Sequence, residues 1–305
     1  MNNWQRFKDS YFFYSFKRDP VALTSLFIFF VLVTVSFLAP VIAPFSPYDT
    51  TTIDIMDAEI PPSWMDDGEE KFFLGTDNMG RDLFSTMLYG LRTSVIIGVG
   101  AVLFQAVLGI AAGLIAGYVG GRIDNFLMRV ADIQFSIPYL IVAIITSAIF
   151  QIAFGVGKFE ELALPLLVII IGLSEWPKYA RTVRASVLGE KNKEYVEAAR
   201  VIGLNRRIIM FRHILPNTMT PVLVISTIQV AQAVMSEAAL SFLCLGMPIT
   251  KPSLGSLINV GFEYVFSGSW WITLFPGTLL VIFTLVVILF GDWLRDVLNP
   301  KLYKG

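Results

Sequence analysis

Six predominantly apolar stretches, separated by polar segments, run along the chain. A bilayer core about 30 Å thick needs about 20 apolar residues in a helix, because every backbone polar group must be hydrogen-bonded within the span. The stretches that meet or approach this length are residues 21–43, 93–119, 131–153, 162–176, 218–245 and 270–291. The fourth is short, but its ends can extend toward Phe159 and Tyr179. The pattern predicts an all-α integral membrane protein with six transmembrane helices.

The first apolar stretch could also be a signal peptide, because Lys17 and Arg18 precede it. However, it is about twice as long as the usual apolar region of a signal peptide. Asp19 and Pro20 fit the N-cap and the first position of a helix, and prolines follow the stretch as they often follow a helix end. We therefore expect an uncleaved first transmembrane helix.

The distribution of Lys and Arg predicts the orientation in the membrane. Eighteen of the 23 basic residues fall before residue 21, within 120–130 and 177–217, or after residue 291. Cytoplasmic loops carry an excess of these residues, so we expect both termini in the cytoplasm. The predicted organisation is a cytoplasmic N-terminal segment 1–20, a first transmembrane helix 21–43, a periplasmic or extracellular segment 44–92, a five-helix transmembrane domain 93–291 with a cytoplasmic loop 177–217, and a cytoplasmic tail 292–305.

Composition supports the membrane prediction. The 305 residues are 55% hydrophobic and 15% charged, whereas an ordinary soluble domain has roughly 25% charged residues. The net charge of -1 is uninformative, because it averages surfaces that face different compartments. Cys244 is the only cysteine, so no disulfide forms within the chain, and we expect it to be a small buried apolar residue.

The segment 44–92 carries ten carboxylates and is too small and too acidic for an independent enzyme domain. Its end is expected to form a short amphipathic helix along the membrane surface, with Leu83, Met87 and Leu88 on one side. This part is either a solvated connector or the lip of a substrate entrance.

Glycines recur every four residues in the second apolar stretch, at positions 109, 113 and 117. This spacing leaves one helix face without side chains and predicts close approach by another helix. The partner helix could belong to this chain or to another one.

Known catalytic patterns are absent from the sequence. There is no HExxH, no zinc-type cysteine spacing and no histidine besides His213 on which a serine or cysteine triad could be built. The "GVGK" at 155–158 resembles the end of a phosphate-binding loop, but Ile152 and Phe159 replace the glycine and the hydroxyl residue that the motif requires. We therefore expect no catalytic residue, no metal site and no cofactor in this chain, so any ATP and Mg would be bound by partner chains.

Polar residues within the fifth apolar stretch are candidates for a translocation path, because ionisable groups at membrane depth are costly. Gln229, Gln232 and Ser236 recur at spacings of three and four and form one stripe, which Glu237 flanks. Hydrogen bonding between helices is the alternative role for all four. Glu175, near a predicted inner end, is expected to be a hydrated interface position.

The polar segment "EYVEAARVIGLNRRIIMFRHILPN", residues 194–217, is predicted to form two short helices below the membrane. Gly203 suits a left-handed helix end, Asn205 can cap a second helix, and Pro216 limits its continuation. Ala198 and Ala199 leave one helix face nearly flat, where a partner could approach closely. A linker packed on its own bundle is the alternative.

This segment resembles the EAA loop of permease subunits of binding-protein-dependent ABC importers, which has EAA, three residues, Gly, nine residues and I-x-L-P. His213 stands where the general pattern has Ile. The stretches "LGTDNMGRDLFSTMLYGLRTS", "WPKYARTVRASVL", "EAALSFLCLG" and "PSLGSLINVG" are similar to the C-type subunit of dipeptide, oligopeptide and nickel permeases. One departure is Cys244, where the family has Gly. The residues that match the coupling motif, with the neighbouring Arg200, are Glu197, Ala198, Ala199, Arg200, Gly203 and Pro216.

The resemblance implies a type-1 ABC importer permease in the bacterial inner membrane. Its partners would be a second related permease subunit, two ATP-binding subunits and an external solute-binding protein, besides membrane lipid. The loop would carry the coupling helix that inserts into an ATPase subunit, and transport would proceed by alternating access. The substrate would be a di- or oligopeptide, although related permeases carry nickel, opines, glutathione or oligosaccharides. A secondary transporter or channel driven by an ion gradient is the alternative.

Overall fold

A computed structural model describes residues 11–49, 51 and 53–298. This part of the chain is helical, with one isolated β-bridge between Thr76 and Asp82 and no strand. Its elements are α2 (Tyr11–Arg18), α3 (Pro20–Phe37), α4 (Ala39–Ile42), η1 (Ile55–Asp57), α5 (Leu83–Val119), α6 (Gly121–Ser136), α7 (Tyr139–Phe154), α8 (Val156–Glu190), α9 (Glu194–Val201), α10 (Arg206–Ile208), η2 (Ile209–Ile214), η3 (Leu215–Thr218), α11 (Met219–Phe242), α12 (Leu254–Phe262) and α13 (Trp271–Val297).

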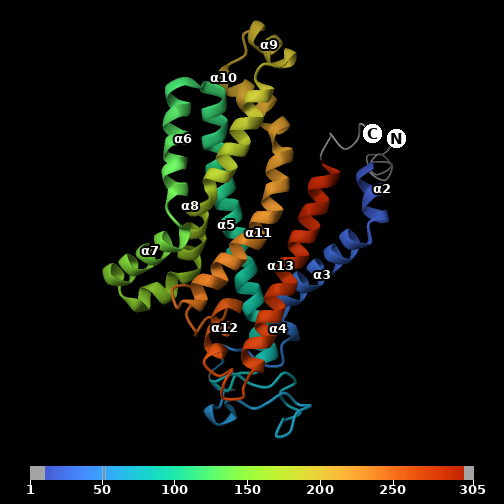
Figure 1. Ribbon diagram of the computed structural model, residues 1–305, viewed down its shortest axis with the longest axis vertical. Helices are drawn as coiled ribbons and strands as arrows, with labels where there is room; N and C mark the ends of the chain where they lie inside the picture. The colour runs from blue at the N-terminus through green and yellow to red at the C-terminus, as the bar shows by residue number, and fades with distance from the viewer. Residues whose placement is uncertain (1–10, 50, 52, 299–305) are drawn as a thin grey trace.

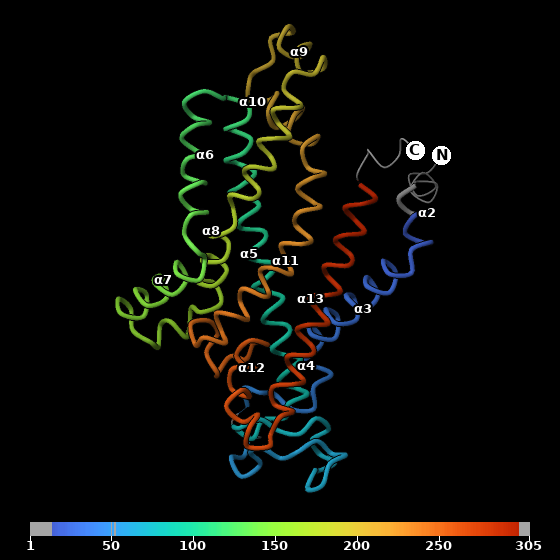
Figure 2. The backbone as a smooth tube through the Cα atoms, viewed as in Figure 1, coloured from blue at the N-terminus to red at the C-terminus, as the bar shows by residue number. Residues whose placement is uncertain are grey.

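The long helices form an elongated bundle whose two ends carry different elements (Figure 1). α5 packs against α8 and α11, while α13 packs against α3, α11 and α12. α9 and α10 lie at one end, and α2 and the end of α13 point toward this same end (Figure 2). The segment between α4 and α5 covers the opposite end, near α12. Which end faces the cytoplasm remains a prediction from the basic residues, of which Arg6, Lys8, Lys301 and Lys304 lie outside the described part.

Four helical segments of the described chain are long and apolar enough to cross a membrane. They are Pro20–Phe37, Leu83–Val119, Arg206–Phe242 and Trp271–Val297. A fifth span results if the bent pair α6 and α7 is one crossing. The predicted fourth span, 162–176, lies inside α8, which continues as a polar helix to Glu190. The count of six therefore remains a prediction.

The predicted span 131–153 is not one straight helix. α6 and α7 meet at an angle of 86°. Pro138 disfavours the helical conformation of the residue before it, and Ile137 is accordingly extended, with φ -103° and ψ 121°. The apolar pattern continues across this break, which is why composition alone suggested a single span.

The first transmembrane helix begins as its sequence predicts. The Asp19 carboxylate accepts hydrogen bonds from the amides of Val21 and Ala22, at 2.9 and 3.1 Å, and Pro20 occupies the first turn. The helix ends at Phe37, earlier than expected, and the short α4 follows. α3 then packs on α13, where the rings of Phe29 and Phe283 lie 6.1 Å apart.

The prediction of an amphipathic surface helix before the second span is wrong. Leu83, Met87 and Leu88 belong to the first turns of α5, which runs unbroken to Val119. All three side chains are buried. Leu83 and Met87 pack with Trp271 in a cluster at this end of the bundle. Their apolar spacing therefore marks a helix packed against protein and not one lying along the membrane surface.

The glycine face of α5 packs against α8 of the same chain, which answers the question of its partner. A Cβ atom added at Gly109 would lie 2.3 Å from the Tyr179 Cβ, and one at Gly113 would lie 2.4 Å from the Ala180 carbonyl oxygen. At Gly117 the Val187 Cβ would be 2.8 Å away. Without side chains the two helices gain close van der Waals contact over two turns.

Candidate functional site

The projecting loop turns at a glycine, as the sequence predicts. α9 ends at Val201, and Gly203 adopts φ +83°, a left-handed conformation that favours glycine. Asn205 then caps α10, because its side-chain oxygen accepts from the amide of Arg207 at 3.2 Å. These two local signals place α9 as a separate short helix at the tip of the bundle (Figure 1).

The second predicted short helix does not end at Pro216. α10 continues as the π-helical turn η2, the 3-10 turn η3 and then α11, so that residues 206–242 form one helical path. Pro216 lies in the first turn of η3, where its missing N–H costs little. The proline changes the winding of the helix and does not stop it. α9 therefore stands beside the extended end of a transmembrane helix.

One face of α9 is fixed to the bundle. Val196 and Ala199 are buried in a cluster that includes Leu114 of α5, Tyr179 of α8 and Ile209 of η2. The sequence suggested that Ala199 belongs to a flat face offered to a partner. The structure shows instead that Ala199 is buried against its own chain. Its small side chain lets α9 lie close to its own chain.

The opposite face of α9 is exposed and partly apolar. Glu197 and Ala198 are exposed, and the side chains of Val201 and Ile202 are 88% and 76% exposed. Apolar side chains gathered at the tip of a polar projection are typical of a protein interaction surface. Val201 and Ile202 were not among the predicted site residues, although they lie between the EAA triplet and Gly203.

Three polar contacts hold α9 in place. The Arg200 guanidinium donates to the Lys191 carbonyl at 3.1 Å, so this residue binds its own chain. The Tyr195 hydroxyl donates to Glu190 at 2.5 Å and accepts from Asn217 at 3.2 Å. Burial, together with the hydrogen bond to the Glu190 carboxylate, raises the pKa of Tyr195 to about 12. The hydroxyl therefore stays protonated at neutral pH and joins the end of α8 to η3.

A cavity of about 210 Å³ lies between α5, α8 and α11. Three of the four candidate path residues, Gln229, Gln232 and Ser236, are among its lining residues. The other polar residues of its wall are Gln105, Tyr139 and Glu175. The stripe predicted along the fifth span thus borders open space, and it meets polar groups from α5, α7 and α8.

Hydrogen bonds connect the amides and the carboxylate of this wall. The Gln229 Nε2 lies 3.3 Å from the Gln105 Oε1 and 3.4 Å from the Glu175 Oε2. Lys178, one turn further along α8, forms an ion pair with the same Glu175 oxygen. Glu175 therefore borders the cavity, whereas the sequence suggested only a hydrated interface position.

Glu237 does not line this cavity. It is fully buried, and it accepts hydrogen bonds from the hydroxyls of Ser94 and Ser241, each at 2.7 Å. The Ser94 hydroxyl accepts in turn from the amide of Leu254, and the Ser241 hydroxyl accepts from the amide of Met247. Glu237 thus joins α5, α11 and the start of α12, and the hydrogen-bonding alternative describes it better than a path-lining role.

Cys244 is exposed, which corrects the expectation of a buried residue. It follows the end of α11 with φ +60°, and the Leu245 amide donates to the Leu240 carbonyl at 2.9 Å. This is the helix end that glycine favours. The positive φ therefore explains why the family pattern has glycine at this position, and the backbone of Cys244 is strained there.

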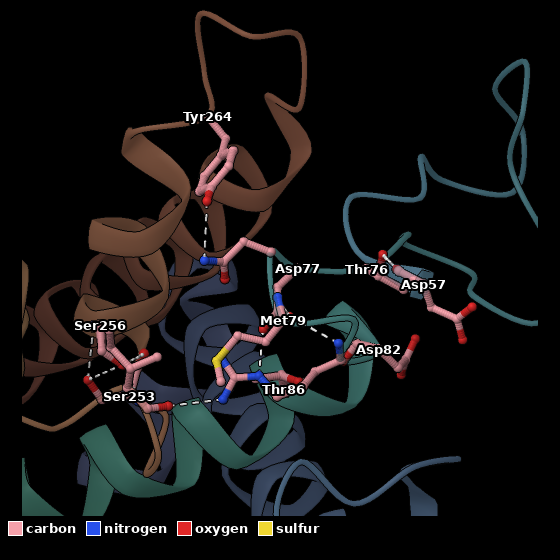
Figure 3. A network of polar contacts seen from close by, with 12 residues as sticks. Asp57, Thr76, Asp77, Met79, Asp82, Thr86, Ser253, Ser256 and Tyr264 are labelled. Carbon is pink, nitrogen blue, oxygen red and sulfur yellow. Dashed lines mark hydrogen bonds and ion pairs between the residues drawn. The ribbon is translucent and has the colours of Figure 1, made fainter. Parts of the chain in front are cut away.

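A buried network fastens the segment before α5 to the end of the bundle. The Arg81 Nε pairs with Asp77 at 2.7 Å, with both side chains buried, and its Nη1 donates to the Ile249 carbonyl at 3.0 Å. The Trp271 indole donates to the Thr76 carbonyl at 3.2 Å. Figure 3 shows Tyr264 and the Asp77 loop facing each other. The end of this segment, residues 76–82, is therefore mostly buried and packed against the bundle, whereas residues 66–71 are mostly exposed.

Within the described ranges, no group of three or more His, Cys, Asp or Glu side chains could hold a metal ion. Within the "GVGK" stretch, Gly155 is the single residue between α7 and α8, with φ +83°, and residues 156–158 belong to the first turn of α8.

Comparisons with known proteins agree with the resemblance seen in the sequence. Residues 109–304 match the family described as "Binding-protein-dependent transport system inner membrane component", and residues 4–62 match the N-terminal transmembrane domain of oligopeptide transport permease C. The chain is 35% identical to the di/tripeptide transport system permease protein DppC of Pseudomonas aeruginosa over 95% of its length and 91% of that protein. It is 34% identical to the oligopeptide transport system permease protein OppC of Bacillus subtilis, over 95% of this chain and 88% of that protein.

Among solved structures, the chain is similar to one from the MetNI methionine ABC transporter in an inward-facing conformation. The TM-score is 0.56 at 20% identity, over 72% of this chain and 99% of that one. This likeness supports the helical fold. The match over residues 109–304, which is more than half of the chain, shows that the chain belongs to the family of inner membrane components of binding-protein-dependent transport systems.

Proposed function

We propose that this chain is one of two related permease subunits of an ATP-driven importer that moves di- or oligopeptides inward across the bacterial inner membrane. The peptide substrate is supported by relatives named as dipeptide and oligopeptide permeases, which are 34–35% identical over nearly the whole chain. The partners would be a second permease subunit, two ATP-binding subunits that hold ATP and Mg, and an external solute-binding protein.

The exposed face of α9 is the observation that carries this proposal. Glu197, Ala198, Val201 and Ile202 form a small, partly apolar surface on a helix whose other face is anchored in the bundle. A partner that pushes on this surface moves the cluster around Ile209, and through it the helical path 206–242. Such a rigid attachment suits the transmission of a movement from an ATPase to the membrane helices.

The cavity beside α11 is the proposed translocation path within this subunit. Gln229, Gln232 and Ser236 would line it, and the second permease subunit would supply the facing wall. Movement of α11 relative to α5 and α8 would change access to the cavity from either side of the membrane, as alternating access requires. Glu237 would hold α5 and α12 together during this movement.

Charge reversal at Glu197 and substitution at Gly203 test the coupling role. In the assembled importer, Glu197→Lys and Gly203→Asp are expected to leave membrane insertion intact and to lower peptide uptake at least about tenfold, because a wrong charge at an interface costs several kcal/mol. The measurements are uptake of labelled alanyl-alanine and ATP hydrolysis stimulated by the binding protein.

Matched controls separate coupling from general damage. Glu69→Lys makes the same charge change on an exposed residue of the segment before α5. Gly121→Asp strains another glycine of positive φ that has open space around it, as Gly203 has. Both controls are expected to transport normally. Normal uptake and normal stimulated ATP hydrolysis in both coupling variants would refute the proposed role of α9.

A further inference from the structure

Three amide side chains lie in the wall of the cavity beside α11. Gln105, Gln229 and Gln232 line it, together with the carboxylate of Glu175. Amide side chains offer both an N–H donor and a carbonyl acceptor, which are the two groups that a peptide bond also presents. The wall therefore has the hydrogen-bonding chemistry to pair with a peptide backbone.

Gln105 carries a donor that the protein itself does not use. Its side chain is fully buried, and its Oε1 accepts from Gln229 at 3.3 Å. Within the described part of the chain, its Nε2 has no hydrogen-bond partner. A buried N–H group without an acceptor is unfavourable and rare in folded proteins. Because Gln105 belongs to the cavity wall, a rotation of its side chain would let this N–H donate to a carbonyl or carboxylate oxygen of a bound molecule.

Glu175 gives the wall a negative charge with one free acceptor. Lys178 and Gln229 both contact its Oε2. No described residue is hydrogen-bonded to its Oε1. Lys178 does not line the cavity, and neither does any other Lys or Arg. Lys178 offsets part of the charge, so the preference of the site for a cation should be moderate.

We infer that Glu175 binds the free α-ammonium group of a peptide, while the Gln105 Nε2 donates to a peptide carbonyl oxygen. The inference rests on the proposed function, and it deepens that function by naming the substrate chemistry. An anionic ligand would find no cation on this wall, and a neutral sugar would bring no positive charge to the free oxygen of Glu175. A peptide with an unblocked amino terminus fits both the free acceptor and the unused donor.

The test measures how well two peptides protect a cysteine in the cavity. Ala239 lines the cavity and lies one turn from Ser236, so Ala239→Cys serves as the reporter in a Cys244→Gly background. The assembled importer is treated with the neutral reagent N-ethylmaleimide in the presence of alanyl-alanine or N-acetyl-alanyl-alanine. Alanyl-alanine is expected to protect at about tenfold lower concentration, because a hydrogen bond to a charged group is stronger than a neutral one.

Three variants assign the effect to the named side chains. Glu175→Gln is expected to remove the difference between the two peptides, whereas Asp132→Asn should keep it. Asp132 is an exposed carboxylate of α6 that pairs with Arg181 and does not line the cavity. Gln105→Met is expected to weaken protection by both peptides, because both carry the carbonyl that uses the donor. Labelling without peptide at the parent rate shows that each variant keeps the cavity intact.

Equal protection by the two peptides, protection by neither, or a preference that survives Glu175→Gln would overturn the inference. Uptake of alanyl-alanine by the unmodified importer is measured in parallel. Uptake without an ammonium preference in the cavity would overturn this inference alone. Absence of peptide uptake, with the binding protein and ATP present, would overturn the proposed function as well.

Discussion

Replacing Asp77 with Asn breaks one half of a buried ion pair while keeping the size of the side chain. Asp77 Oδ2 lies 2.7 Å from the Arg81 Nε, and the side chains are 0% and 3% exposed. The other carboxylate oxygen accepts from the amides of Met79 and Arg81, and Asn can preserve these bonds. The guanidinium would keep its bond to the Ile249 carbonyl but lose its counter-ion.

The size of the effect follows from this burial. Removing one partner of a buried pair costs about 3–5 kcal/mol, because the other charge is left without compensation. Each 1.4 kcal/mol is about a tenfold change in an equilibrium, so local opening of this segment should become at least about a hundredfold more frequent. The matched control is Asp57→Ala. Asp57 lies 3.4 Å from Lys71 in a more exposed pair, which is worth less than about 1 kcal/mol and hence less than about fivefold.

Trypsin measures the opening directly. Cleavage after Arg81 requires the buried side chain to become accessible, so its rate follows the open population when closing is faster than cleavage. Cleavage after Lys71, whose side chain is 49% exposed, provides an internal reference. We expect Asp77→Asn to accelerate cleavage after Arg81 strongly, with little effect from Asp57→Ala. Similar acceleration in both variants would refute the argument from burial.

Two further substitutions test the packing. Gly113→Ala is expected to destabilise the bundle by about 1–3 kcal/mol, because its Cβ would lie 2.4 Å from the Ala180 carbonyl oxygen. Gly277→Ala, with open space around the added carbon, should show no such loss in thermal unfolding, and equal losses would contradict the close α5–α8 contact. Cys244→Gly is expected to raise thermal stability by about 1 kcal/mol, since φ is +60° there. An unchanged or lower melting temperature would show that the cysteine is not strained.

Local chemistry made part of this structure predictable. Asp19, Gly203 and Asn205 act through hydrogen bonds or backbone angles within three residues of themselves. Their roles at helix ends could therefore be predicted from the neighbouring residues in the sequence. The glycine spacing in α5 likewise predicted close helix packing. The EAA pattern predicted the family, because a long motif at fixed spacing is specific even where each residue alone is not.

Contacts between distant segments were not predictable. Glu237 looked like a path residue because it flanks a polar stripe, but its partner Ser94 is 143 residues away in sequence. Ala199 looked exposed because alanine suits a flat surface, and only the position of η2 shows that it is buried. The buried pair of Asp77 and Arg81 lies in an acidic segment that resembles a solvated connector. In each case the missing information was which element covers the residue.

The proposed coupling role requires that the exposed face of α9 contacts an ATPase subunit. It can be tested by cross-linking from Ala198→Cys in a Cys244→Gly background, using a short bis-maleimide in the assembled importer, where an ATPase subunit offers a cysteine near the site. Glu69→Cys, an exposed position at the opposite end of the bundle, is the control. We expect a covalent adduct of this chain with an ATPase subunit from Ala198→Cys and none from Glu69→Cys. No ATPase adduct from Ala198→Cys, or equal adducts from both positions, would contradict the proposed role.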